Sequence, residues 1–367
     1  MYADKRGFRP DMKGKAAVSR FKYRRPAAAL PLKWALAAAV LMIVLLYVPA
    51  PYLVAQPGPA QEAAPLVHVG EEAGERDGGF LVMTVYMAGR SNYWMVLQSL
   101  WRKDLEAYPR NEILQGGTMD DYAQRMHVLM DHSQSSAVEA AYRQAGISYA
   151  IGTKAIVITD PGDGTGFAPG DRITEVDGTA LTDAGQLLEL LKDKAGEDGQ
   201  QPWRIAVERG GVSARVEVPK GGSAQGNSLD EQDLPRLLGV DELTVVKAIV
   251  PEDPAHQVEI KAGEVAGPSA GLAFALEIYD RLTGGELAEG RKIAATGTIS
   301  PDGSVGAIGG AALKVIAAQR AGAQMFLVPK GNYKEAARQA EATGTSMVII
   351  PVATLAEALE GLKGNGF

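Results

Sequence analysis

The longest apolar stretch of the chain lies near its beginning. No charged residue occurs for 28 residues from Trp34 onward, and the segment 34–54 is almost entirely apolar. As a helix these 21 residues span about 31 Å at ~1.5 Å per residue, which matches the hydrocarbon core of a bilayer. Trp34 at one end and Tyr47 and Tyr52 at the other are residues typical of membrane–water interfaces. The pattern predicts a transmembrane helix over 34–54.

The chain on the two sides of this predicted helix differs in charge. Residues 1–33 contain ten Lys or Arg and two Asp, so their net charge is +8, and the remaining residues carry −15 of the total of −7. Basic segments stay in the cytoplasm, so we expect a basic cytoplasmic arm over 1–33 and a single-pass protein of the cell membrane with an extracytoplasmic body. A cleaved signal peptide has a similar pattern, but the arm is long and residues 49–55 offer no clean A-x-A site.

Composition narrows the function classes. A length of 367 residues is sufficient for two or three domains. A composition of 46% hydrophobic and 22% charged residues is typical of packed globular domains. The absence of cysteine excludes a disulfide scaffold, a thiolate metal site and a cysteine nucleophile. An acidic body disfavours nucleic acid as a partner. His127 and His132 would point about 140° apart on a helix, so we expect no metal.

Residues 55–146 are interpreted as a tether and a membrane-proximal segment. The first part is rich in Pro, Gly and Glu, and 79–88 has the β-branched and aromatic content of a strand. Two helices are predicted within 91–145. The second is expected to begin at Ser136, where Glu139 completes a capping box, and to end at Gly146.

Short strands predominate in residues 147–222. Turn signals separate them, and one helix is predicted near 183–193. The segment 166–178 (GFAPGDRITEVDG) resembles the core signature of a PDZ domain, a fold that binds a peptide end as an added strand. Because the preceding loop is short and Gly-rich, a purely structural small β domain is the alternative for this PDZ-like domain.

Beyond a polar linker at 223–239, strand and helix patterns alternate through residues 240–363. This alternation predicts a domain that contains both helices and strands, of the α/β or α+β class. Helices are expected at 270–282, 311–321, 333–342 and 354–362, and strands at 243–250, 256–261, 292–298, 325–328 and 346–352.

One serine of this domain lies in a pattern found around nucleophiles. Residues 267–271 (GPSAG) match G-x-S-x-G, although a helix start with a serine cap also produces this pattern. All four histidines precede Ser269, whereas an α/β-hydrolase needs its histidine after the serine. His256 remains as a base only by convergence, and a structural role in a strand is the alternative.

Lys314 has an unusual position for a lysine. Its neighbours on one face of the predicted helix are small and apolar, namely Ala311, Ala317, Ala318 and Ala321. Burial lowers the pKa of an amine toward neutrality and makes it a usable base. A snorkelling surface lysine is the alternative.

Three motifs together carry a family resemblance. Residues 267–271 (GPSAG), 296–299 (TGTI) and 303–314 (GSVGAIGGAALK) look like those of the proteolytic domain of Lon-type Ser–Lys proteases, in the same order and at similar spacing. The predicted anchor and PDZ-like domain extend the resemblance to membrane-anchored Lon-like proteases of bacteria, including pheromone-processing enzymes. Ala311-Ala312-Leu313 departs from the family pattern, with altered packing expected.

The resemblance implies an ATP-independent serine endopeptidase acting outside the cytoplasm. Ser269 would be the nucleophile, Lys314 the general base and Thr296 a supporting hydroxyl. No cofactor is implied, and the chain has no G-x-x-x-x-G-K-[ST] motif for ATP. Expected partners are peptide or unstructured protein substrates, membrane lipid through 34–54 and further copies of the chain. The rival interpretation is a PDZ-bearing membrane scaffold whose peptidase fold is inactive.

Overall fold

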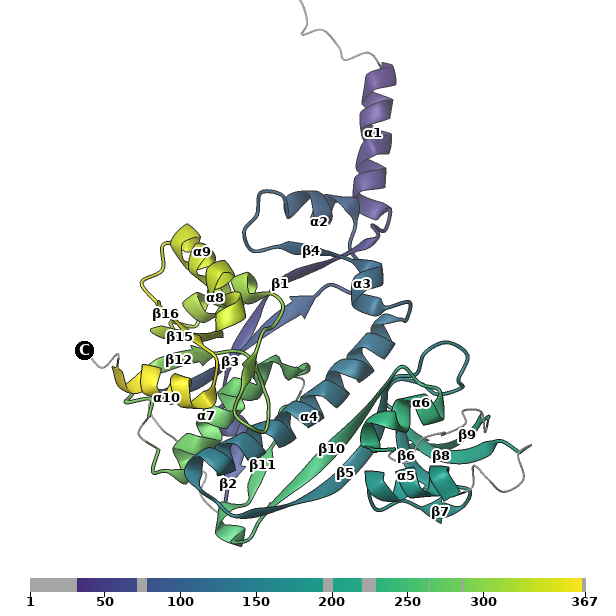
Figure 1. Ribbon diagram of the computed structural model, residues 1–367. Helices are drawn as coiled ribbons and strands as arrows, with labels where there is room; N and C mark the ends of the chain where they lie inside the picture. The colour runs from purple at the N-terminus through teal and green to yellow at the C-terminus, as the bar shows by residue number, and fades with distance from the viewer. Residues whose placement is uncertain are drawn as a thin grey trace, which may run out of the picture. The chain divides into compact units, whose positions relative to one another are not determined.

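The structure, a computed structural model, divides the chain into two units, residues 1–48 and residues 49–367 (Figure 1). The basic arm predicted over 1–33 lies outside the described residues except at its last two positions. The described residues are 32–70, 78–193, 201–219, 229–263, 265–285 and 287–364.

The first unit contains helix α1 (Leu32–Tyr47), none of whose residues is buried. The helix ends seven residues before the predicted limit of 54, so the predicted bounds are wrong at that end. Pro49 and Pro51 lack the amide hydrogen that a continuing helix needs, and the chain is extended from Tyr52. Within the described ranges, no helix combines the length and apolar character required to cross a membrane.

The second unit is built around a six-stranded sheet with the order β16-β15-β12-β3-β1-β4. Strands β16, β15, β12 and β3 run parallel to one another, whereas β1 pairs antiparallel with β3, and β4 pairs antiparallel with β1. The bounds are β1 (Tyr52–Glu62), β3 (Gly79–Met87), β4 (Glu106–Pro109), β12 (Lys292–Ala295), β15 (Met325–Pro329) and β16 (Val348–Val352).

Strand β1 occupies the start of the Pro-, Gly- and Glu-rich part of the segment 55–146, so the interpretation of that part as a tether is wrong. The strand predicted at 79–88 is confirmed as β3. Strand β1 accommodates its prolines because the register with β3 shifts between Pro57 and Ala60, where a strand tolerates a missing amide hydrogen. Strand β3 then pairs in parallel with β12. The α/β domain predicted over 240–363 therefore takes part of its central sheet from much earlier in the chain.

Helices cover both faces of the sheet. Phe80 and Val82 of β3 belong to the core shared with α4, α7 and α10, whereas Leu81 and Met83 belong to the core shared with α8 and α9. This alternation follows the two-residue period of a strand, and each such buried side chain contributes about 1.5–3 kcal/mol. The helix bounds are α4 (Met119–Ala145), α7 (Gly271–Leu282), α8 (Ala311–Arg320), α9 (Tyr333–Thr343) and α10 (Leu355–Gly364).

The predicted start of a helix at Ser136 is wrong, because Ser136 is buried within α4. The helix begins instead at a capping box, in which Thr118 Oγ1 accepts from the amide of Asp121 and the Asp121 carboxylate accepts from the amide of Thr118. The predicted end at Gly146 is correct, with the glycine in a left-handed conformation. Two short helices precede α4, namely α2 (Tyr93–Gln98) and α3 (Arg110–Leu114).

A second sheet, with the order β10-β5-β6-β8-β9 and β7 beside β6, contains the β-rich module predicted over 147–222. Strand β10 pairs along the whole of β5, so the sheet extends past the predicted boundary at 240. The bounds are β5 (Tyr149–Asp160), β6 (Arg172–Val176), β7 (Thr179–Ala180), α5 (Ala184–Asp193), β8 (Trp203–Arg209), β9 (Val212–Val218), α6 (Leu234–Leu238) and β10 (Glu242–Pro251).

The polar linker predicted over 223–239 is only partly a linker. Its residues 223–228 lie outside the described ranges, but Leu234 and Leu238 of α6 are fully buried in the core of the second sheet. They pack there in one cluster with Leu187 and Leu191 of α5. Leucines four positions apart lie on one face of a helix. The polar residues around them made the sequence resemble a linker, so this apolar helix face was not predicted.

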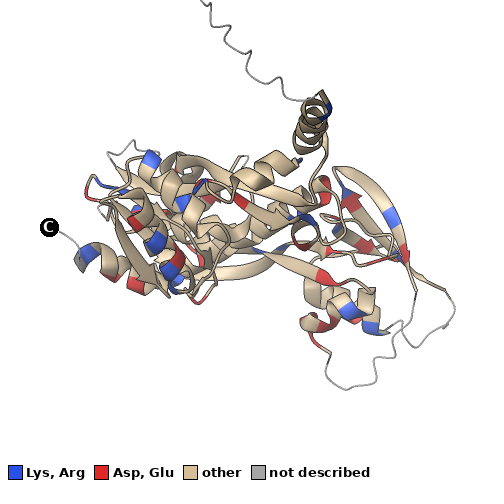
Figure 2. Ribbon diagram, turned by 90° about the horizontal axis from the view of Figure 1, so that it is seen from above, with Lys and Arg blue, Asp and Glu red and all other residues tan. Residues whose placement is uncertain are grey.

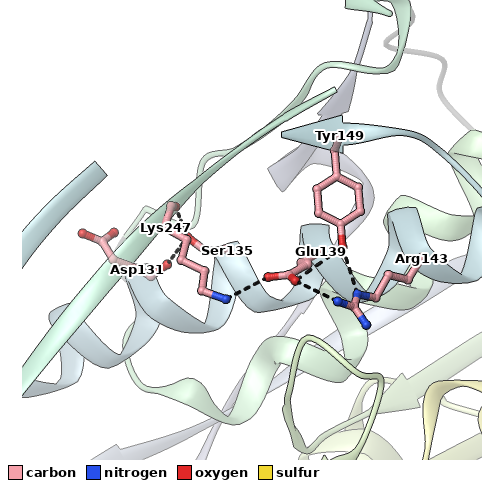
Figure 3. A network of polar contacts seen from close by, with 6 residues as sticks. All are labelled: Asp131, Ser135, Glu139, Arg143, Tyr149 and Lys247. Atoms are coloured by element: carbon pink, nitrogen blue, oxygen red, sulfur yellow. Dashed lines mark hydrogen bonds and ion pairs between the residues drawn. The ribbon is translucent and has the colours of Figure 1, made fainter. Parts of the chain in front are cut away.

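A polar network joins α4 to both strands of the β5–β10 pair (Figure 3). The Glu139 carboxylate is 2% exposed and lies 3.3 Å from Lys247 Nζ of β10. It also lies 3.6 Å from Arg143 Nη2 and accepts from the Tyr149 hydroxyl of β5. Ser135 Oγ donates to the Lys247 carbonyl over 2.7 Å. Helix α4 is therefore fixed to the second sheet by a buried carboxylate with cationic partners.

Replacing this carboxylate by an amide tests the network. Glu139→Gln keeps the shape but removes the charge that faces Lys247 and Arg143, so we expect a loss of about 1–3 kcal/mol in unfolding free energy. Both cations are partly exposed and can be solvated, which limits the loss. Urea unfolding measures the change, with the exposed Glu259→Gln as control. Equal effects of the two variants would contradict the role assigned to Glu139.

Candidate active site

The GPSAG segment forms the turn that starts α7. A single 3-10 turn, Pro268–Ala270, continues directly into the helix. Gly267 has a φ of 92°, a backbone conformation that other residues rarely adopt. A Cβ at Gly271 would lie 2.7 Å from Ser133 Oγ and 2.9 Å from Ile299 Cγ2. The first glycine is therefore required by the turn and the second by close packing.

Helix α4 holds this turn from the other side. Ser133 Oγ donates to the Pro268 carbonyl over 3.0 Å, and the Gly267 amide donates to the Met126 carbonyl over 2.9 Å. Sequence reasoning missed these supporting residues. Ser133 and Pro268 are 135 positions apart, and no local pattern in α4 marks a contact at that range.

The structure brings Ser269, Thr296 and Lys314 together. Lys314 Nζ lies 2.7 Å from Ser269 Oγ and 2.9 Å from Thr296 Oγ1. Ser269 is half-buried, whereas Thr296 is fully buried and Lys314 is 2% exposed. Thr296 follows the end of β12, just before the short hairpin of β13 (Thr298–Ile299) and β14 (Val305–Gly306). Three separate elements thus supply the three side chains.

Lys314 lies on the buried face of α8, as its apolar neighbours predict. Ala311, Ala317 and Ala318 are buried with it, and Ala321 is half-buried. Burial lowers the pKa of Lys314 from 10.5 to about 7. Its two polar contacts are hydroxyl groups, which solvate an ammonium but do not neutralise its charge. At neutral pH a large fraction of the amine therefore carries a free lone pair.

The Thr296 hydroxyl fixes the direction of the amine. Thr296 Oγ1 donates its hydrogen to the Ser269 carbonyl over 3.0 Å. Its oxygen can therefore only accept in the contact with Lys314 Nζ. The Gly297 amide donates to the same Ser269 carbonyl over 2.9 Å. With one N–H directed at Thr296, the lone pair of the neutral amine is free to face Ser269 Oγ. The arrangement can remove a proton from that serine hydroxyl.

Removal of the Thr296 hydroxyl should weaken this arrangement without destroying it. We expect Thr296→Val to lower the kcat of peptide hydrolysis about 10- to 100-fold, the equivalent of a hydrogen bond to a charged group worth about 1.5–3 kcal/mol. Steady-state kinetics measure the change, with Thr298→Val as control because Thr298 has no contact with the lysine amine. Equal losses in both variants would contradict an orienting role for Thr296.

His256, the alternative base, has contacts with Tyr142 and Asp253, and the histidine pair His127 and His132 lies on α4. His256 ends a 3-10 turn, Pro254–His256, rather than lying in the predicted strand, because Pro254 and the Asp253 cap favour the turn. Its carbonyl accepts from the Tyr142 hydroxyl, and its ring nitrogen is 4.0 Å from Asp253. Across the described part of the chain, no group of three or more His, Cys, Asp or Glu residues is arranged to hold a metal ion.

Comparison with known proteins shows which protein family the C-terminal region is similar to. Residues 252–363 match the family model of the Lon protease (S16) C-terminal proteolytic domain. A Lon protease of Azospirillum brasilense is 39% identical over 94 residues, which are 26% of this chain and 11% of that protein. A Lon protease of Citrifermentans bemidjiense is 32% identical over 171 residues, 45% of this chain and 19% of that protein.

The matched segment is thus less than a fifth of each of these relatives. The segment 252–363 that matches the family model contains Ser269, Thr296 and Lys314 and begins just after β10. The matches support a serine peptidase with its Lon-type proteolytic domain at the C-terminal end of a mixed α/β chain.

Proposed function

From the Lon-type domain and the geometry of its three polar side chains, we propose that the protein is an endopeptidase in which Ser269 is the nucleophile and Lys314 the general base. The observation that carries the proposal is the buried amine of Lys314, 2.7 Å from Ser269 Oγ and without a carboxylate partner among the described contacts. A scaffold with an inactive peptidase fold has no need to keep an amine desolvated in this way, since the burial costs stability.

Acylation follows from this arrangement. Ser269 Oγ attacks the carbonyl carbon of the scissile peptide bond while its proton passes to the Lys314 lone pair. The negative charge on the carbonyl oxygen is stabilised by the backbone N–H of Ser269 and by the positive end of the helix dipole at the start of the 268–282 helical segment. The Lys314 ammonium then gives its proton to the departing amine, and an acyl ester remains on Ser269.

Hydrolysis of the ester reverses these roles. A water molecule loses a proton to the neutral Lys314 amine and attacks the ester carbonyl. The ammonium returns the proton to Ser269 Oγ as the carboxylic product leaves. Thr296 holds the amine in both half-reactions, because its contact with Nζ does not depend on the bond that breaks.

The substrates proposed are peptides and unstructured protein segments. This chain has no phosphate-binding loop for ATP, so it lacks its own means to unfold a folded substrate. We further propose that the apolar residues 34–48, which belong to the first unit and are preceded by the +8 arm, anchor the protein in the cell membrane with an extracytoplasmic catalytic domain. The β-rich module, by its PDZ-like segment 166–178, would present substrate.

Hydrolysis of an unstructured protein in the absence of ATP tests the activity. The full chain in detergent should cleave an unfolded, fluorescently labelled protein and leave the same protein intact when it is folded. ATP should change neither rate. Cleavage that needs ATP would contradict the proposed ATP independence. Absence of cleavage by the wild type, with equal labelling of wild type and Ser269→Ala by an acylating agent, would favour the inactive scaffold.

A further inference from the structure

Helix α2 and the loop after it, residues 93–101, form an aromatic segment on the surface of the second unit. None of the six residues of α2 is buried, although five of them are apolar. The loop adds two further exposed apolar side chains. The exposed fractions are Tyr93 40%, Trp94 37%, Leu97 37%, Leu100 78% and Trp101 57%.

The aromatic segment has a defined conformation despite this exposure. Asn92 caps the helix by accepting from the Met95 amide over 2.9 Å, and the rings of Trp94 and Trp101 meet edge to face at 6.1 Å. Lys103 Nζ donates to the Ala342 carbonyl of α9 over 3.2 Å and secures the far end of the loop. An isolated helix of six residues is unstable in water, and contiguous exposed apolar side chains usually mark an interaction site.

The segment lies beside the point where the chain enters the second unit. Pro49 forms a β-bridge with Asn92, and the Ala50 amide donates to the Ser91 carbonyl over 2.8 Å. Ser91 Oγ, which is buried, accepts from the Val54 amide over 2.9 Å. These bonds fix the start of the aromatic segment next to Pro49 and Ala50, the first residues of the second unit, which follow α1 closely in sequence. The chain therefore enters the second unit beside the aromatic segment.

We infer that the aromatic segment docks on the lipid surface of the membrane. This inference rests on the proposed anchoring of the apolar run. Trp and Tyr are the side chains that favour the headgroup region, and Leu100 adds an apolar tip. Figure 2 shows acidic and basic residues interspersed over most of the ribbon, and the sequence of α2 contains none. Five exposed side chains also fall short of the about 20–30 residues that each partner of a stable protein complex contributes.

Tryptophan quenching by brominated lipids tests this docking. The chain has four tryptophans, so Trp34→Phe leaves Trp94 and Trp101 as reporters and the buried Trp203 as an internal control. The full chain is reconstituted into phosphatidylcholine vesicles whose acyl chains carry bromine near the headgroup. We expect loss of the larger part of the Trp94 and Trp101 emission relative to unbrominated vesicles. Adding Trp94→Phe and Trp101→Phe should leave emission that bromine does not change.

A second protein separates docking from anchoring. A variant with Trp94→Phe and Trp101→Phe keeps Trp34 as the reporter of the apolar run. Quenching of Trp34 without quenching of Trp94 and Trp101 would overturn the docking and leave the anchor intact. Quenching of Trp94 and Trp101 alone would support the docking and overturn the anchor, and quenching of neither would overturn both. Efficient cross-linking between chains through Leu100→Cys, with Trp94 and Trp101 shielded from bromine, would assign the surface to a second copy instead.

Discussion

Replacement of Lys314 by methionine is expected to reduce kcat/KM about 10³- to 10⁴-fold, because the general base is lost. The fold should survive, since methionine has a similar length and fills the same apolar surroundings on α8. The unfolding free energy at neutral pH should be unchanged or higher. Activity and stability are therefore expected to move in different directions in one variant.

The stability part follows from proton binding. The pKa of Lys314 is 10.5 in the unfolded chain and about 7 in the folded one. Between these values the unfolded state binds more protons, so the contribution of this group makes stability rise with pH across that window. Below pH 7 the full cost of the buried ammonium is present, of order 5 kcal/mol by the difference in pKa. Lys314→Met removes this cost and should flatten that part of the stability curve.

Two further variants control this prediction. Lys314→Arg keeps a charge that cannot be lost near neutral pH, so it should be inactive and less stable than the wild type. The exposed Lys334→Met should change neither activity nor stability. Substantial activity in Lys314→Arg would show that the lysine amine is not the base, and His256 would be the next candidate. Urea unfolding at several pH values and initial rates on one peptide give all of these results.

Replacement of Ser269 by alanine is expected to have the largest effect on activity. Loss of the nucleophile should lower kcat by about four to six orders of magnitude. The helix start should persist, because the Pro268 and Ser269 carbonyls remain available to Ser133 and Thr296. The circular dichroism and melting temperature should therefore change little.

The matched control for this variant is Ser300→Ala, whose exposed side chain lies outside the three-residue cluster. We expect full activity from it. Mass spectrometry after treatment with an acylating agent should place the added mass on Ser269 in the wild type and nowhere in Ser269→Ala. An adduct on another serine, or hydrolysis that persists in Ser269→Ala, would contradict the assignment.

The candidate site was predictable because its signals are local. The GPSAG segment marks a turn into a helix, and the alanines around Lys314 mark a buried face within one helix. Residues 311–321 and 270–282 were predicted as helices nearly as the structure has them. Their proximity in space, by contrast, came from the family resemblance, since no local rule brings together side chains 45 positions apart.

The remaining parts of the fold depend on contacts at long range. The prolines of β1 suggested a tether, but a register shift places them in the central sheet. Ser136 and Glu139 imitate a helix start, yet both are buried in the middle of α4, where Glu139 contacts Lys247 of β10 and Tyr149 of β5. The leucines of α6 looked like part of a polar linker because their packing partners are on α5. In each case tertiary burial outweighed the local pattern.

The pH dependence of Ser269 acylation tests the central claim, activation of Ser269 by a neutral Lys314, most directly. The rate constant for labelling by an acylating agent is measured across the neutral range for the wild type and Lys314→Arg. The wild-type rate should rise along a single ionisation with a pKa near 7 and then become constant, because burial gives Lys314 a pKa of about 7. Lys314→Arg should label slowly and without this ionisation. A wild-type rate without an ionisation near pH 7, or the same profile in Lys314→Arg, would contradict the account.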